Sequence, residues 1–123
     1  MGTFRVTIEI GDPRGERWKT VDALVDTGAS DTFAPRSLLA RLGLKSEERW
    51  PFRRADDREV EYDVAQTQIR IAGRTRSTLV AFEEEGSEPM LGASTLEMFH
   101  LGVDPVGRRL IPVPGLRARE VSS

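Results

Sequence analysis

Apolar and polar residues alternate strictly at the start of the chain. Residues 4–10 carry apolar side chains at every second position, which is the period of a strand with one buried face. Residues 11–15 are rich in Gly, Pro and Asp and predict a turn. We expect a second strand over residues 17–25, paired with the first as a hairpin. Asp26 then follows directly after an apolar strand.

Residues 48–71 alternate again and predict a second, longer hairpin that is exposed to solvent. Its strands carry apolar residues at spacings of two, and its tip is polar. The tip consists of Ala55, Asp56, Asp57 and Arg58. Four aromatic residues in or near this hairpin are candidates for a binding pocket, or equally for the core: Trp50, Phe52, Tyr62 and Phe82.

Two short helices and two short strands complete the pattern. The first helix would begin at Pro35, with three leucines on its apolar side and a glycine just past its end. The second would span about residues 95–100, because Ser94 and Glu97 have the spacing of a capping box. The short strands are expected at residues 78–82 and 109–113. Strands outnumber helices and long alternating helices are absent, so the sequence predicts a mostly-β domain.

The length of 123 residues fits one domain with one core. We assign residues 1–114 to this domain and expect residues 115–123 to form a flexible tail. The 18 Lys and Arg residues nearly balance 20 Asp and Glu residues, so nothing favours a nucleic-acid partner. No signal-peptide pattern and no membrane-length apolar stretch is present, and we expect a cytoplasmic protein without a membrane partner.

The chain has no cysteine, which excludes disulfides, thiol catalysis and cysteine-bound zinc. It has a single histidine, His100, which we interpret as the end of a helix. With so few ligands we expect neither a metal nor a cofactor. Serine hydrolysis is poorly supported, because Ser30 and Ser94 lack the Gly-x-Ser-x-Gly context of a nucleophile.

Asp26-Thr27-Gly28 is the feature with the clearest chemistry. As three residues it could be an ordinary surface turn. However, residues 21–25 before it are mostly apolar, so we expect Asp26 to be at least half buried, where an unpaired carboxylate is costly. A two-fold dimer would bring two copies of this aspartate together. Carboxylates about 3 Å apart share one proton, so that one activates water while the other acts as an acid.

On two motifs the chain resembles the retroviral-type, or retropepsin-like, aspartic proteases. The first motif is Leu24-Val25-Asp26-Thr27-Gly28-Ala29-Ser30. The second is Met90-Leu91-Gly92, which leads into a predicted helix. The order of elements between the motifs also matches, and the resemblance extends over about residues 4–113. It implies a closed or partly open β-barrel of the acid-protease type, with one lobe per chain and one or two short helices.

The resemblance also implies roles for individual residues. Asp26 would be the catalytic aspartate of a homodimeric endopeptidase that cleaves peptides or unfolded proteins. Thr27 would form hydrogen bonds across the dimer, and Gly28 would let backbone amides approach the carboxylates. Leu91 and Gly92 would pack under this loop. Residues 53–62 would form the flap that closes over an extended peptide.

The chain departs from the family pattern in three places. The flap tip is polar, whereas viral members have a Gly-rich, apolar tip. Ser30 and Ala93 stand where viral enzymes have an Asp and Arg that pair, so both partners are missing together. Ala29 cannot donate a hydrogen bond to the aspartate dyad, so we expect a higher dyad pKa and a milder acidic optimum than in pepsin-like enzymes. The polar tip leaves a second interpretation open, a catalytically silent module for dimerisation or peptide binding.

Overall fold

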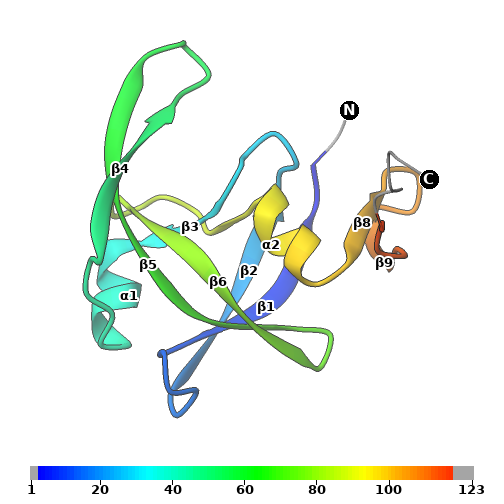
Figure 1. The fold of residues 1–123 in the computed structure, drawn as a ribbon, viewed down its shortest axis with the longest axis horizontal. Coiled ribbons are helices and arrows are strands. Elements are labelled where there is room, and N and C mark those ends of the chain that lie inside the picture. Colours follow the sequence, from blue (N-terminus) through cyan, green and yellow to red (C-terminus); the bar gives the residue numbers. More distant parts are fainter. Residues whose placement is uncertain (1–2, 118–123) are drawn as a thin grey trace, which may run out of the picture.

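The computed structural model describes residues 3–117 and shows a mostly-β fold, as the sequence predicts (Figure 1). The elements follow one another in the order β1 (Arg5–Gly11), β2 (Trp18–Val25), β3 (Thr32–Pro35), α1 (Arg36–Arg41), β4 (Glu48–Arg53), β5 (Glu59–Ile71), β6 (Arg74–Glu83), β7 (Met90–Leu91), α2 (Ala93–Met98), β8 (Leu101–Asp104) and β9 (Arg109–Pro112). Of the predicted tail, residues 118–123 lie outside the described part. Within that part, no helix is long and apolar enough to cross a bilayer.

Both predicted hairpins are present. β1 and β2 pair antiparallel from Arg5 opposite Leu24 to Gly11 opposite Trp18. The turn between them is held by Asp12, whose Oδ1 accepts hydrogen bonds from the backbone N–H of Glu16 at 2.7 Å and of Arg17 at 3.2 Å. β4 and β5 form the longer hairpin, which projects from the rest of the molecule (Figure 1).

Seven strands form one sheet in the order β1-β2-β7-β3-β6-β5-β4. β1 also pairs with β5, through Glu9 opposite Arg70 and Ile10 opposite Ile69. This additional pairing makes the sheet return on itself as a ring, with β4 left outside as an edge strand. Apolar side chains fill the ring, and the largest fully buried ones are Phe99, Ile8, Ile10, Leu39, Ile69 and Leu91. Alternation along β1 and β5 places Ile8, Ile10 and Ile69 inward.

The structure corrects the predicted start of the first helix. Pro35 is the last residue of β3 and precedes α1, whose first residue is Arg36. The sequence analysis missed β3 altogether, because four residues are too few to show a period. β3 is a strand because it pairs with β6 in parallel, from Thr32 opposite Val80 to Pro35 opposite Glu83.

The predicted capping box of the second helix is also wrong. α2 begins at Ala93, its N-cap is Gly92, and no side chain caps it. The Ser94 hydroxyl instead donates a hydrogen bond to Asp31 Oδ1 at 2.9 Å. The expected short strand at residues 78–82 is part of the longer β6. β8 was not predicted, and it pairs with β9 in a separate two-stranded sheet.

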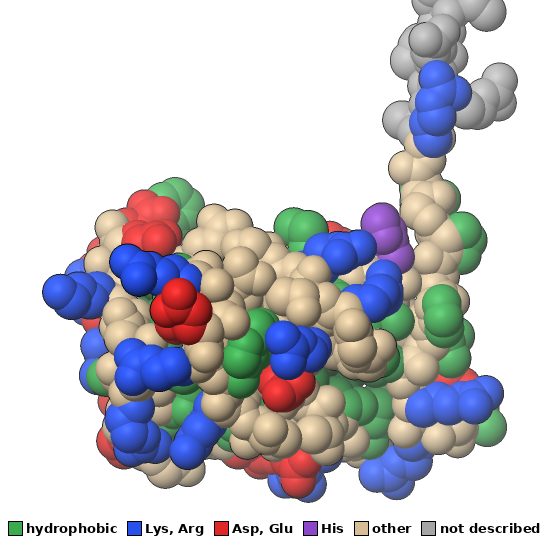
Figure 2. Space-filling view, turned by 90° about the horizontal axis from the view of Figure 1, so that it is seen from below, with side chains coloured by type: hydrophobic (Ala, Val, Ile, Leu, Met, Phe, Trp, Pro, Cys, Tyr) green, Lys and Arg blue, Asp and Glu red, His purple; other side chains and the backbone are tan. Residues whose placement is uncertain are grey.

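The surface carries charges of both signs. Figure 2 shows basic and acidic side chains side by side on the face viewed there. Many of them form exposed ion pairs, such as Arg5 with Glu88 at 2.6 Å and Arg49 with Glu61 at 3.3 Å. Exposed pairs of this kind each contribute little to stability.

Candidate active site

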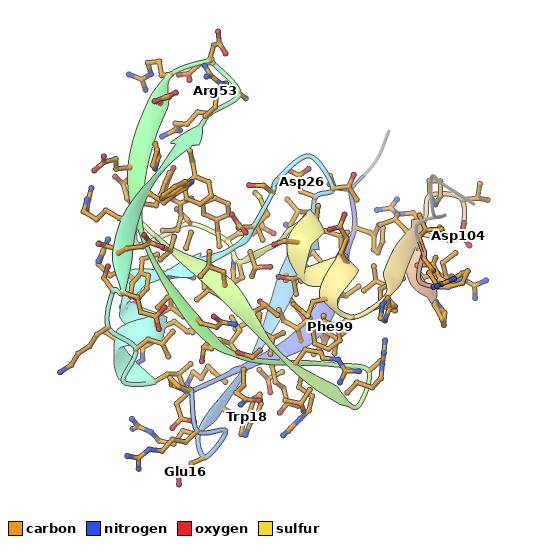
Figure 3. The ribbon with its side chains drawn as sticks, viewed as in Figure 1. Glu16, Trp18, Asp26, Arg53, Phe99 and Asp104 are labelled. Atoms are coloured by element: carbon orange, nitrogen blue, oxygen red, sulfur yellow. The ribbon has the colours of Figure 1, made fainter. Side chains whose placement is uncertain are left out.

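Asp26 lies one residue beyond β2, where the sheet holds the chain on both sides. The Val25 N–H donates to Phe4 O at 2.8 Å, and the Asp26 N–H donates to Leu91 O at 3.1 Å. Leu91 is fully buried beside this strand, which it joins through the parallel β2–β7 pairing. Asp26 itself is partly buried, as predicted. The site is therefore built on the sheet, and Figure 3 shows Asp26 on the side where the hairpin bearing Arg53 rises.

Residues 26–29 turn tightly around the carboxylate. The Gly28 N–H donates to Asp26 Oδ1 at 2.9 Å, and the Ala29 N–H donates to the Asp26 carbonyl at 3.1 Å. A side chain at position 28 would bring its Cβ to 3.2 Å from Asp26 Oδ1, so glycine is the residue that leaves this oxygen unobstructed. Thr27 is exposed at the outer side of the turn.

Main-chain hydrogen bonds fasten this loop to the start of α2. The Ala93 N–H donates to Ala29 O, and the Ser94 N–H donates to Ser30 O, both at 2.8 Å. At the positions of the missing Asp–Arg pair, Ser30 and Ala93 thus hold the loop through their backbones. Asp31 adds two side-chain contacts, from Ser94 Oγ at 2.9 Å and from Ser30 Oγ at 3.3 Å.

A buried group of hydroxyls lies directly beneath the loop. Thr32 Oγ1 lies 2.6 Å from Thr95 Oγ1 and accepts the Gly92 N–H at 3.2 Å. Thr95 Oγ1 also lies 3.2 Å from Thr78 Oγ1. Because all three threonines are buried, each hydroxyl depends on these partners. These three hydroxyls link β3, β6 and α2 behind the site.

Gly92 is required by the close approach of α2 to the loop. A Cβ at this position would lie 2.9 Å from Asp31 N and even closer to the carbonyl group of Asp31. These are backbone atoms, which cannot rotate away. The sequence analysis placed Leu91 and Gly92 under the loop, and the structure brings both to that position.

A cavity of about 710 Å³ lies between the Asp26 loop and the β4–β5 hairpin. Asp26, Gly28 and Ala29 line one side of it, and the hairpin lines the other. Phe33, Phe52 and Tyr62 pack edge-to-face within its wall, with ring centroids 5.3 to 5.4 Å apart. We call this cavity the hairpin groove. Its mixed apolar and polar lining suits an extended peptide segment.

Three of the four proposed pocket aromatics, Trp50, Phe52 and Tyr62, line the groove. Phe82 does not line it, because it is packed in the core and only 4% exposed. Phe33 was missed with the strand that carries it. Its one signal in the sequence is an apolar residue shortly after the Asp-Thr-Gly motif.

Exposed ion pairs join the charged side chains at the polar tip of the β4–β5 hairpin. Arg53 contacts Asp57 and Glu59 at 3.3 Å each, and Arg58 contacts Asp56 at 3.0 Å. Asp57 has a φ of 72°, the left-handed conformation that a tight turn requires here. The predicted tip residues therefore form the turn, and their charges are paired within the hairpin. Of them, Ala55 lines the hairpin groove.

A second hollow of about 430 Å³ opens on the other side of Asp26. It is lined by Phe4, Thr27, Val103 and Pro105, among others. The catalytic candidate therefore borders two open spaces, one under the hairpin and one beside Thr27. Within residues 3–117, no group of three or more His, Asp or Glu residues is arranged to hold a metal ion.

A strand-end Asp-Thr-Gly loop supported by a Leu-Gly segment, with a hairpin above it, defines the class of retropepsin-like aspartic proteases. The family comparison agrees. The model of the family described as gag-polyprotein putative aspartyl protease matches residues 17–98, more than half of the chain, and the chain belongs to this family. No curated protein matches the chain in sequence.

Solved structures show the same fold at low sequence identity. The protease of simian foamy virus matches with a TM-score of 0.56 and 19% identity, over 78% of this chain and 94% of its own. The retroviral protease-like domain of Ddi1 from Leishmania major matches with a TM-score of 0.60 and 17% identity, over 91% of this chain and 89% of its own. A retropepsin-like aspartic protease from Rickettsia conorii matches with a TM-score of 0.53 and 19% identity, over 85% of this chain and 89% of its own.

Proposed function

We propose that the protein is a homodimeric aspartic endopeptidase with one Asp26 from each chain. The observation that carries this proposal is the placement of Asp26, which the sheet holds between the hairpin groove and the hollow beside Thr27. A second copy related by a two-fold axis at this hollow would add its own Asp26 and Thr27. The groove would then receive the substrate, and no further catalytic side chain is required.

Two carboxylates brought about 3 Å apart hold one proton between them. The ionised one takes a proton from water as the water attacks the peptide carbonyl, and the protonated one donates to the carbonyl oxygen. The Gly28 N–H, 2.9 Å from Asp26 Oδ1, fixes the orientation of the carboxylate. Ala29 offers no hydroxyl to stabilise the charged dyad, so we expect the enzyme to work at mildly acidic pH.

The β4–β5 hairpin would serve as the flap. β4 is an edge strand, and an extended peptide lying beneath the hairpin can use backbone hydrogen bonds together with contacts to the aromatic wall. The charged side chains of the tip form ion pairs within the hairpin, Asp57 with Arg53 and Asp56 with Arg58. This polar tip also favours the second candidate function, a silent module that binds peptides without cleaving them.

The test compares wild type with Asp26→Asn on an unfolded protein and on peptides. Asparagine retains an oxygen for the Gly28 N–H, so the fold should persist while cleavage falls at least about a thousandfold. Asp22→Asn is the matched control. Asp22 is exposed on β2, the strand that precedes Asp26, and its substitution removes the same charge. Cleavage that survives Asp26→Asn would disprove the mechanism.

Measurements of binding and turnover on the wild-type protein distinguish the two candidate functions. Peptide binding without turnover at any pH between about 3 and 7, a range that spans ordinary carboxyl pKa values, would favour the silent module. Sedimentation over a dilution series measures the dimer directly. Activity per chain should fall on dilution in parallel with the dimer fraction.

A further inference from the structure

A cavity that the proposed reaction does not use lies between the main sheet and the β8–β9 sheet. It has a volume of about 640 Å³ and shares no lining residue with the hairpin groove or with the hollow beside Thr27. Its lining comes from β1, from both sides of the β5–β6 turn and from both strands of the small sheet, which Figure 1 shows beside the C-terminus. We call it the β8–β9 cavity. Its size is in the range of sites for small organic ligands.

Most of the lining of the β8–β9 cavity is apolar. Ile71 and Leu101 are buried, whereas Val113 is 38% exposed. A hydrocarbon chain placed against these side chains leaves water, which is favourable for each methylene that is covered. The apolar lining residues are Val6, Ile71, Leu101, Leu110, Pro112 and Val113.

Arg74 gives this apolar cavity a positive charge. Its guanidinium donates a hydrogen bond to the Phe99 carbonyl at 2.5 Å and lies 5.8 Å from the centre of the Phe99 ring, so the buried Phe99 holds it in place. A guanidinium has five N–H donors, and the others are available to a ligand. The ion pairs found among residues 3–117 do not include Arg74.

His100 is the second basic side chain of the cavity. Its backbone is fixed by a hydrogen bond from its N–H to Glu97 O at 3.1 Å and by one from the Val113 N–H to its carbonyl at 2.9 Å. Thr7 also lines the cavity, and its hydroxyl donates to the exposed Asp22 at 3.0 Å. In the part of the chain that the structure describes, no acidic side chain belongs to the lining. The polar groups that the cavity offers a ligand are therefore basic.

We propose that the β8–β9 cavity is a binding site for a fatty carboxylate. The hydrocarbon chain packs on the apolar lining, and the carboxylate accepts hydrogen bonds from Arg74 and His100. A neutral lipid leaves the guanidinium without a counter-charge, and an inorganic anion leaves the apolar lining in water. Only a ligand that is both apolar and anionic complements the whole lining. The ligand would bridge two sheets that no strand pairing joins, and it should raise Tm because it binds the folded state.

The test titrates the full chain, labelled with ¹⁵N, with octanoate and follows the backbone amide shifts by NMR. The amides of Leu101, Leu110 and Val113 should shift and saturate. Octanol has the same chain without the charge and should bind about tenfold more weakly, because a charge-assisted hydrogen bond is lost. Hexanoate should also bind about tenfold more weakly, because it buries two methylenes fewer.

Variants connect the affinity to the lining. Arg74→Gln should weaken octanoate about tenfold and leave octanol unchanged. Arg76→Gln is the matched control, because Arg76 is exposed on the same strand and does not line the cavity. His100→Asn should likewise weaken octanoate alone. Asparagine suits this position because it tolerates the left-handed conformation, in which His100 has a φ of 53°.

Equal binding of octanoate and octanol overturns the proposal, and so do shifts confined to residues outside the cavity. Octanoate binding that is unchanged in both Arg74→Gln and His100→Asn also overturns it. If Arg74→Gln does not fold, Val113→Glu decides, because it adds a negative charge at a partly exposed lining position and should weaken octanoate more than octanol. None of these measurements involves peptide cleavage, so the result does not depend on the proposed function.

Discussion

The close contact between Gly92 and the Asp26 loop makes Gly92→Ala a sharp test of how the site is held together. Gly92 has a φ of −100°, so alanine is compatible with its backbone conformation and the whole effect comes from the added methyl group. That methyl would lie 2.9 Å from Asp31 N and closer still to the Asp31 carbonyl. α2 and the loop would have to separate, which stretches the hydrogen bond from the Gly92 N–H to Thr32 Oγ1.

The expected cost follows from these contacts. Overpacking against fixed atoms costs about 1–3 kcal/mol, and the weakened hydrogen bond adds about 1 kcal/mol. Replacing glycine restricts the unfolded chain and returns about 0.5–1 kcal/mol. The net loss is about 1–3.5 kcal/mol, which for a chain of this size lowers Tm by roughly 4–14 °C.

Thermal unfolding followed by circular dichroism measures this loss. Wild type and variant are compared at one protein concentration, because dimer formation would itself raise Tm. Gly115→Ala is the matched control, since its Cβ would lie 3.4 Å from the His100 ring, an ordinary contact. Its stability should stay within about 0.5 kcal/mol of wild type. If Gly92→Ala melts within about 2 °C of wild type, the loop is not held against α2 as described.

Two further substitutions test the surroundings of the site. Thr32→Val keeps the shape of the buried side chain but leaves the Gly92 N–H without its acceptor. Urea unfolding should therefore show a free energy of unfolding lower by about 2–3 kcal/mol. Thr20→Val, at an exposed position, is the control and should change the free energy of unfolding little. Hydrogen bonds from Arg36 and then from Ser46 lower the pKa of Asp63 in the folded protein below its ordinary value of 3.8. The ionised Asp63 therefore stabilises the fold at pH values above 3.8. This stabilisation is lost as the pH falls toward the lower pKa of the folded state. Asp63→Asn should therefore be less stable at pH 7 and lose less stability on acidification below about pH 4, and parallel urea midpoints for the two proteins would contradict this.

The two hairpins, and with them most of the sheet, could be predicted from the sequence because their partners are neighbours along the chain. Residues 4–10 show their period directly, and the strand that pairs with them comes only one turn later. The same holds for β4 and β5. The missed strand β3 has no partner close to it in the sequence. Its partners β6 and β7 lie far along the chain, and four residues cannot show alternation by themselves.

The capping box failed for a related reason. Ser94 and Glu97 have the right spacing, but the spacing does not reveal that Asp31 lies 2.9 Å from the Ser94 hydroxyl. Asp31 and Ser94 are 63 positions apart, and the folding of β7 against β2 brings them together. A contact between such distant residues outcompetes the local cap without leaving a trace in the local pattern.

The sequence by itself determined the strand that ends just before Asp26, the Asp-Thr-Gly turn and the polar hairpin, because each is encoded by residues a few positions apart. Only the tertiary structure decided that Phe33 and Asp31 line the hairpin groove, and that Gly92 approaches the backbone of Asp31 too closely for any side chain. These features arise where the sheet closes into a ring. The closure joins strands that are far apart along the chain, and no local period of apolar residues specifies which of them meet.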